Sequence, residues 1–259
     1  MDFGIRGKRA LVCASSKGLG RGVAEALAGE GVKLILNART AEVLEATAEE
    51  IRQAYGVEVV AVAADITSEE GRAEVLKAAG EVDILVTNAG GPPPGMWTDW
   101  NRDDFIAAID ANMLSAVALM QALVPGMMTR GWGRVVNITS RSVKAPIAAL
   151  GLSNTARAGL TGFVAGTSRQ VAGSGVTINN VLPGSHDTDR IRGADARNAG
   201  LKGISVEEQK TARMAGNPVG RDGTADEFGA VCAFLCSQQA AFMVGQNIVV
   251  DGGEVNATI

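Results

Sequence analysis

Aromatic residues, histidine and tyrosine are scarce in this chain of 259 residues. Phe, Trp and Tyr together make up 4% of it, and it contains one histidine, His186, and one tyrosine, Tyr55. The core must therefore be built from Ala, Val, Leu and Ile, in line with a hydrophobic content of 46%. A single histidine excludes a Cys/His metal cluster, and we expect no metal site.

Cysteine is also rare. The three cysteines, Cys13, Cys232 and Cys236, cannot all pair with one another. Cys232 and Cys236 lie four residues apart on what reads as one apolar helix face, a spacing that a metal pair could also use. Buried, reduced thiols are the favoured interpretation.

The chain lacks an excess of positive charge and any long apolar run. Its 24 basic and 28 acidic residues give a net charge of −4, which argues against binding a nucleic-acid backbone or an anionic membrane. Nowhere do about 18 uncharged apolar residues follow one another, and the first ten residues carry charges instead of a signal-peptide run. We expect a cytoplasmic protein without nucleic-acid or membrane partners.

Short β-branched runs alternate with segments of helix length. The runs occupy residues 9–14, 33–38, 57–65, 82–90, 134–140, 176–184 and 247–253. Apolar runs without in/out alternation are typical of strands buried on both faces, and repeated βα units favour a parallel sheet. We predict an α/β fold, a doubly wound seven-stranded parallel (Rossmann) sheet, in a single domain over residues 1–259.

Two irregular segments separate these units. Residues 90–95 read GGPPPG directly after a strand, which indicates a stiff loop over a binding crevice. Residues 187–217 are charged, contain scattered glycines and are compatible with helix. We interpret them as a substrate lid, and a solvated surface excursion is the equally weighted alternative.

The first βα turn, CASSKGLG over residues 13–20, places glycines at the start of a helix. Such a turn lets the backbone approach a pyrophosphate, although it also serves plain helix–strand packing. It resembles the Thr-Gly-x-x-x-Gly-x-Gly turn of short-chain dehydrogenases/reductases, with Ala14 in place of the first glycine. The residues expected around the cofactor here are Ala14, Ser15, Ser16, Lys17, Gly18, Leu19 and Gly20.

The second strand ends in Ala38-Arg39, where an NAD site would place a carboxylate. Arg39 and Lys17 instead offer two cations to a 2′-phosphate, so we predict NADP(H) as cofactor. A solvated arginine at a strand end is the alternative.

Further motifs resemble this family in order along the chain. Asp65-Ile66 is similar to its adenine contact, Asn88-Ala89-Gly90 to its Asn-Asn-Ala-Gly, and Asp251-Gly252-Gly253 to its terminal turn. The resemblance makes Asn112 a structural and proton-relay residue and Ser140 the catalytic serine. It also implies that Pro183, Gly184 and Thr188 hold the nicotinamide.

One departure from the family concerns catalysis. The family's Tyr-x-x-x-Lys pair aligns with Ser153 and Arg157, and the only tyrosine, Tyr55, lies elsewhere. A serine hydroxyl is a poorer acid than a tyrosine beside an ammonium group, and an arginine does not shuttle protons. We expect Arg157 to bind the cofactor ribose and Ser153 to occupy the tyrosine's place.

His186, inside the Pro-Gly loop, is the remaining candidate proton donor, and a structural hydrogen-bonding role is the favoured alternative. Arg141 and Lys144 are either anion clamps in the crevice or, more in keeping with their loop, solvated charges.

The resemblance implies an NADP(H)-dependent oxidoreductase acting on a small carbonyl or alcohol, similar to 3-oxoacyl-ACP reductases but with altered catalytic residues. It also implies a homotetramer, with a homodimer as alternative. A protein of another class, an NADPH-binding scaffold or sensor without turnover, is the rival hypothesis, because loss of the tyrosine would not affect it.

Overall fold

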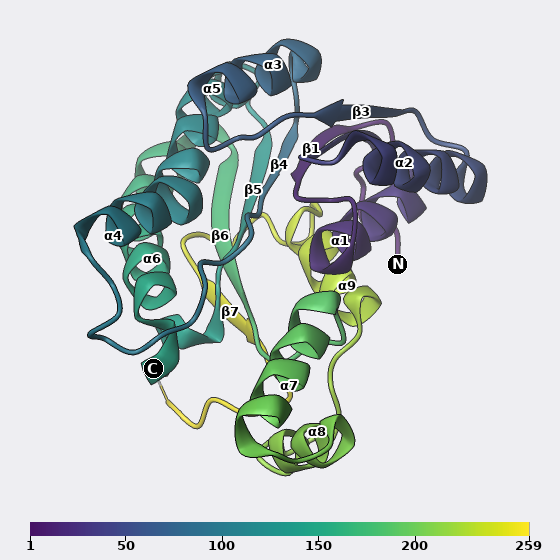
Figure 1. Ribbon diagram of the computed structural model, residues 1–259. Coiled ribbons are helices and arrows are strands. Elements are labelled where there is room, and N and C mark those ends of the chain that lie inside the picture. The colour runs from purple at the N-terminus through teal and green to yellow at the C-terminus, as the bar shows by residue number, and fades with distance from the viewer. Residues whose placement is uncertain (259) are drawn as a thin grey trace.

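The computed structural model describes residues 1–258 and contains a seven-stranded sheet at its centre (Figure 1). The strand order is β3-β2-β1-β4-β5-β6-β7, and every neighbouring pair runs parallel. The order reverses between β1 and β4, so the crevice beyond the carboxyl ends of these two strands is where this architecture binds ligands. The predicted doubly wound parallel sheet is confirmed.

The strands coincide with the β-branched runs of the sequence. They are β1 (Arg9–Cys13), β2 (Lys33–Ala38), β3 (Val59–Ala63), β4 (Ile84–Thr87), β5 (Gly133–Ile138), β6 (Val176–Pro183) and β7 (Asn247–Val250). Within β1, Ala10 and Val12 belong to one apolar core and Leu11 and Cys13 to the other. A strand that is buried on both faces needs apolar residues throughout, which is why these runs do not alternate.

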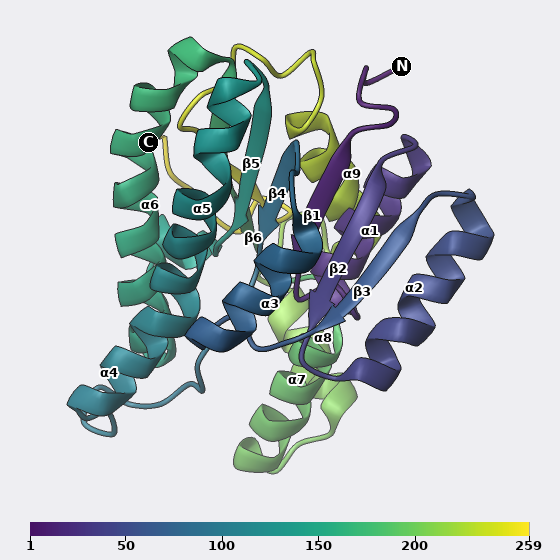
Figure 2. The ribbon, with the colours of Figure 1, turned by 90° about the horizontal axis from the view of Figure 1, so that it is seen from above.

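Helices cover both faces of the sheet. They are α1 (Gly18–Gly29), α2 (Ala41–Tyr55), α3 (Glu69–Ala79), α4 (Arg102–Ile109), α5 (Ser115–Thr129), α6 (Gly151–Val171), α7 (Asp189–Lys202), α8 (Val206–Met214) and α9 (Ala225–Leu235). Helices α1, α2 and α9 contribute to one core, and α3, α5 and α6 to the other (Figure 2). A π-helical turn, η1 (Asp110–Leu114), joins α4 to α5, and short 3₁₀ turns η2 (Arg141–Val143), η3 (Ala148–Leu150) and η4 (Ala172–Ser174) complete the chain's helical segments.

Helices α1 and α9 approach each other through glycines. A Cβ added to Gly22 would overlap the backbone of Ala225, and one added to Gly229 would overlap the Gly22 carbonyl group. Such close backbone contact is open only to residues without a side chain. It brings α9 tightly against α1, whose amino terminus faces the crevice.

The segment Arg102–Thr129 is the one stretch, among the described residues, that is long and apolar enough to cross a membrane by length and composition. Its most apolar window is 44% buried within this fold. Leu119, Leu123 and Met127 of α5 lie in the second core. The length and apolarity of the segment are those expected of a core helix packed on a sheet.

The segment predicted to be a lid, residues 187–217, forms helices α7 and α8, which project beyond the carboxyl edge of the sheet (Figure 1). Arg213 of α8 joins them to the rest of the molecule: its guanidinium donates to buried Asp195 on α7 and to Asp222. The ion pair holds the pKa of Asp222 below its usual range. The segment is thus an ordered helical pair, and its function as a lid stays a prediction.

The turn after β1 contains the one non-glycine residue with a left-handed backbone among residues 1–258, Ala14, with φ of +48°. Two neighbours leave the backbone little freedom there. Buried Ser15 donates its backbone N–H to the carbonyl of Asn37 at 3.0 Å, and a Cβ on Gly20 would overlap the Ala14 carbonyl. A glycine, which the family's turn has at this place, would adopt the same left-handed conformation without strain.

We expect Ala14→Gly to raise the free energy of unfolding by about 0.5–1 kcal/mol. The left-handed conformation costs an alanine about 1–2 kcal/mol, from which a glycine's extra backbone entropy of about 0.5–1 kcal/mol must be subtracted. Urea unfolding followed by tryptophan fluorescence measures the difference. Ala63→Gly, at an exposed position at the end of β3, is the control and should be destabilising. A loss of stability in Ala14→Gly would contradict the strain.

Candidate active site

The amino terminus of α1 is free of side-chain caps and acidic residues. The N-cap residue Lys17 makes no capping hydrogen bond, whereas Ser68, Asn101 and Thr224 cap α3, α4 and α9 with their side chains. The first N–H groups of α1 and the positive end of its dipole are therefore open to an anion. Because Gly18 has φ of +60° and Gly20 has no room for a side chain, the turn can bring its backbone against a phosphate.

The two cations expected at the cofactor, Arg39 and Lys17, differ in their partners. Arg39 follows β2, is exposed, and makes no ion pair with any of residues 1–258. The Thr67 backbone N–H, and to a smaller extent the charge of Arg39, lowers the pKa of Asp65. Lys17 Nζ instead lies 3.1 Å from Asp189 Oδ2 on α7, a partner that the sequence did not indicate.

The Pro-Gly loop reaches the same turn. Thr188 packs beside Gly18, since a Cβ on Gly18 would lie 3.4 Å from its methyl group. Gly184 lies against Asp251, where a side chain would overlap, and Asp251 accepts hydrogen bonds from the backbones of Gly253 and Val255. The motifs at Gly18, Gly184 and Asp251, far apart in sequence, thus meet at one edge of the sheet.

The end of β4 lies on the other side of the glycine turn. The Asn88 amide would lie 3.1 Å from a Cβ on Gly20. The Cys13 thiol lies beside the Asn88 backbone N–H, and burial raises its pKa to about 12. Cys232 and Cys236 are likewise buried and free, so the three thiols are reduced and protonated.

Arg157 lies at the floor of the crevice and is 6% exposed. Its Nη2 donates to Asn112 Oδ1 at 3.0 Å and, less closely, to the Ala89 carbonyl at 3.4 Å. Its Nη1 donates to the Ile138 carbonyl at 2.9 Å, and its Nε donates to Ser153 Oγ at 3.2 Å. The guanidinium therefore joins the carboxyl ends of β4 and β5 to η1 and α6. Protein acceptors engage most of its donors, which leaves few for a ligand. Ribose binding by Arg157 stays a prediction.

Burial, and to a smaller extent the charge of Arg190, lowers the pKa of Arg157 to about 10. The group stays a cation at neutral pH. It has no carboxylate within ion-pair distance among the described residues, so its charge is balanced only by neutral oxygen acceptors.

Asn112 presents a free donor to a cavity. The side chain is 4% exposed, and its Nδ2 has no hydrogen-bond partner within residues 1–258. It lies in the π-turn η1, which widens the helix at this point. The cavity, of about 420 Å³, lies beneath the GGPPPG loop and is lined among others by Pro92, Trp100 and Leu152. A buried, unpaired amide donor facing a cavity is suited to hydrogen-bond a ligand or water.

The two serines differ in exposure. Ser140 is half-buried at the end of β5, and its Oγ accepts the backbone N–H of Ser142 at 3.1 Å. Ser153 is 3% exposed, and its hydroxyl accepts from Arg157. Each hydroxyl keeps its own hydrogen for a further partner, and Ser153 is the more deeply buried of the two.

His186 faces the interior. Its Nδ1 lies 3.2 Å from the Gly184 carbonyl, and its ring packs edge-on against Phe228 of α9, with 5.2 Å between centroids. Gly223 contacts the other side of the ring. Burial lowers the pKa of His186. No hydrogen bond joins it to Ser140, Ser153 or Asn112 in the described chain, an arrangement that fits a structural role.

Of the two loop cations, Arg141 forms an ion pair with Glu254, 2.6 Å between Nε and Oε2, and Lys144 is exposed. Arg190 on α7, which the sequence reasoning missed, lies at the crevice. A Cβ on Gly91 would overlap its guanidinium. Its position two residues after Thr188 of the Pro-Gly loop was the available signal.

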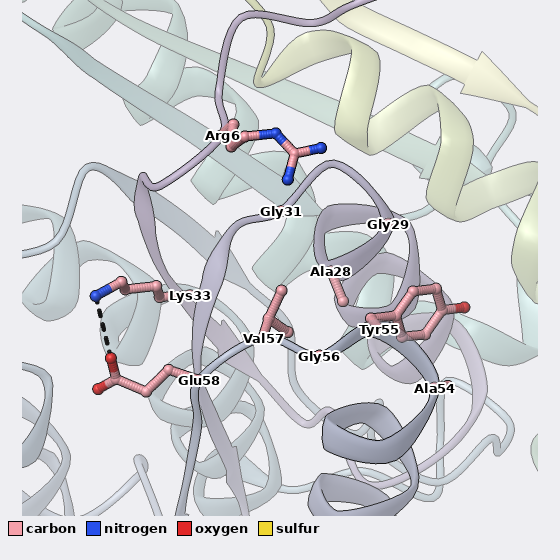
Figure 3. Close-up of a pocket in the computed structure, with 10 residues that line it drawn as sticks. All are labelled: Arg6, Ala28, Gly29, Gly31, Lys33, Ala54, Tyr55, Gly56, Val57 and Glu58. Carbon is pink, nitrogen blue, oxygen red and sulfur yellow. Dashed lines mark ion pairs between the residues drawn. The ribbon is translucent and has the colours of Figure 1, made fainter.

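A second hollow, of about 440 Å³, lies at the opposite edge of the sheet (Figure 3). It is lined by residues such as Arg6 and Tyr55, and Lys33 pairs there with Glu58 at 3.2 Å. It contains none of the motif residues, so the crevice beside β1 and β4 is the candidate active site.

Comparisons with known proteins agree with this location. A family model described as enoyl-(acyl carrier protein) reductase matches residues 13–254. The chain is 34% identical to the 3-oxoacyl-[acyl-carrier-protein] reductase FabG of Vibrio cholerae, over 96% of this chain and 98% of that protein.

Solved structures share the fold. L-sorbose reductase from Gluconobacter frateurii, complexed with NADPH and L-sorbose, superposes with a TM-score of 0.95 at 29% identity over 99% of this chain and all of that one. YwfH, an NADPH-dependent reductase involved in bacilysin biosynthesis, gives 0.92 at 26% identity over 97% and 99%. With a family model and relatives that match from the glycine turn to the terminal Asp-Gly-Gly turn, this chain belongs to the short-chain dehydrogenase/reductase family of oxidoreductases.

Proposed function

We propose that this protein is an NADP(H)-dependent reductase or dehydrogenase of a small carbonyl or alcohol. The observation that carries the proposal is the uncapped amino terminus of α1, flanked by Lys17 and Arg39 with no carboxylate at the end of β2. Similar proteins support it, since L-sorbose reductase is complexed with NADPH and YwfH is an NADPH-dependent reductase.

The residues present fit the cofactor. The N–H groups of the turn from Ala14 to Gly20 would hold its pyrophosphate, and Arg39 and Lys17 its 2′-phosphate. Asp65 and Ile66 would lie at the adenine, and Asn88, Ala89, Gly90, Pro183, Gly184 and Thr188 at the nicotinamide end. When bound, the cofactor donates or accepts the hydride.

The substrate's oxygen would lie between Ser140 and Asn112. Ser140 has a hydroxyl hydrogen to donate, and the Asn112 Nδ2 is a buried donor without a partner. Two neutral donors next to the Arg157 cation would stabilise negative charge developing on a carbonyl oxygen. The cavity beneath the GGPPPG loop would take the remainder of the substrate.

The proton would come from water instead of a side chain. Arg157 remains charged at neutral pH, Ser153 lies beneath it, and His186 is directed toward Phe228. A hydride-transfer site without a positioned acid loses a factor of about 10²–10⁴, which slows turnover without abolishing it. The non-catalytic scaffold gains no support from the comparisons, since the relatives named above are reductases.

Assembly and location stay predictions. A homotetramer is expected, with a homodimer as alternative. The cytoplasm remains the expected compartment.

Wild-type protein should bind NADPH about 10–150-fold more tightly than NADH, because charge-assisted bonds to the 2′-phosphate contribute about 1.5–3 kcal/mol. Fluorescence titration with both cofactors measures this ratio. Arg39→Asp should reverse the preference. Asp189→Asn, which frees Lys17 from its ion pair, should raise the affinity for NADPH and leave the affinity for NADH unchanged. Arg102→Asp, on the surface of α4, is the control. Equal wild-type affinities for the two cofactors would rule out the NADP(H) assignment.

Arg157→Met should lower the free energy of unfolding by about 2–4 kcal/mol, because buried carbonyl groups that lose their donor cost about 1–3 kcal/mol each. Urea unfolding measures the loss. Arg169→Met, an exposed position on the same helix, should change stability little. If the two variants are equally stable, Arg157 does not organise the floor of the site.

His186→Gln should leave turnover within a few-fold of wild type, measured as NADPH oxidation with a panel of ketones, quinones and β-ketoacyl thioesters. Its effect should appear in stability against pH. As pH falls below about 6.5, the unfolded chain takes up a proton that the buried imidazole, with its lowered pKa, does not, so wild type loses stability.

Between pH 7.5 and 5.5 the variant should lose less stability than wild type, and the comparison is clean because the chain has no other histidine. A hundredfold fall in turnover with unchanged NADPH affinity would instead make His186 the proton donor.

A further inference from the structure

The first turn of α7 crosses the crevice. Its N-cap residue Thr188 packs on Gly18, Asp189 pairs with Lys17, and Arg190 lies on Gly91 of the GGPPPG loop. Three consecutive residues thus bridge the cofactor turn and the loop over the cavity, and each has its own contact. Arg190 is the one that contacts the GGPPPG loop.

Arg190 has no anionic partner. It makes no ion pair and no side-chain hydrogen bond with any of residues 1–258. The acids nearest in sequence are already engaged, Asp187 with Arg192, and Asp189 with Arg192 and Lys17. Arg213 and Arg221, by contrast, are both paired with carboxylates.

A second cation without a carboxylate lies on the same backbone segment. Arg157 donates to the carbonyl of Ala89, two residues before Gly91, while Arg190 packs on Gly91 itself. Burial, and to a smaller extent the charge of Arg190, lowers the pKa of Arg157, while Arg190 itself is exposed to solvent. Two like charges near each other repel, and an anion beside them would offset that repulsion.

The donors of Arg157 are largely engaged by protein oxygens, so the free guanidinium is that of Arg190. Its planar, bidentate geometry suits a carboxylate or a phosphate. The cofactor's phosphates have their own place at the α1 terminus and Lys17. Arg190 instead contacts the loop whose neighbouring residues, from Pro92 to Gly95, line the cavity with Asn112.

We propose that Arg190 binds the carboxylate of an anionic substrate and orients its carbonyl group toward Ser140 and Asn112, so that the enzyme selects oxo acids or hydroxy acids over neutral analogues. This inference rests on the proposed oxidoreductase function and adds the class of substrate. The positive electric field of Arg157 at the crevice floor also favours a negatively charged substrate.

The test compares acids with their methyl esters. NADPH oxidation is measured with 2-oxobutanoate, acetoacetate and levulinate, each beside its ester, for wild type, Arg190→Met and the control Arg197→Met, an exposed arginine on the same helix. For the accepted acid, wild type should show a kcat/KM about 10–100-fold above that of the ester. Arg190→Met should remove this ratio, with ester turnover and NADPH affinity within about twofold, and Arg197→Met should keep it.

Three results overturn the proposal: no preference of wild type for any acid, an equal loss for acid and ester in Arg190→Met, or a loss of NADPH affinity with the acid preference intact. The last assigns Arg190 to the cofactor's phosphates.

Calorimetric titration of each oxo acid into the NADPH-bound proteins separates the inference from the proposed function. Binding that depends on Arg190 without any turnover supports the carboxylate site and refutes the activity. Turnover without a dependence on Arg190 does the reverse.

Discussion

The buried guanidinium of Arg157 is the interaction on which the candidate site depends. It donates to the backbone after β4, to the end of β5, to the π-turn and to a serine on its own helix. A lysine ammonium has three rotatable donors and could not reach these acceptors together, whereas a planar fork on a long stem can. Arg157 thus ties the ends of β4 and β5 to η1 and α6.

Ser153, one turn before Arg157 on α6, lies against this guanidinium. Its hydroxyl accepts a hydrogen bond from Arg157 Nε at 3.2 Å, and its side chain is 3% exposed. Under the proposed function, Asn112, Ser140 and this fixed cation would stabilise negative charge on the substrate, and the proton would not come from the Ser153–Arg157 pair.

Helix α7 brings the charged groups of Asp189 and Arg190 to the crevice. Lys17, the N-cap residue of α1, pairs with Asp189, so the position of α7 and the electric field at the amino terminus of α1 are coupled. Arg213 between Asp195 and Asp222 makes the helical pair α7–α8 an ordered body. A mobile surface excursion would not hold Arg190 against Gly91 in this way.

Local pattern was enough to predict the strands, the parallel sheet and the glycine turn, because buried runs and turn residues report on the backbone next to them. The alignment of Ser153 and Arg157 with the family's Tyr-x-x-x-Lys pair stays a prediction. It could also predict that Ala14 takes a glycine's place, but not its φ. The direction of the His186 ring, the pairing of Lys17 with Asp189 and the position of Arg190 over Gly91 were decided by tertiary structure. These features depend on which side chains from distant segments meet across the carboxyl edge of the sheet, and sequence spacing carries no information about such contacts.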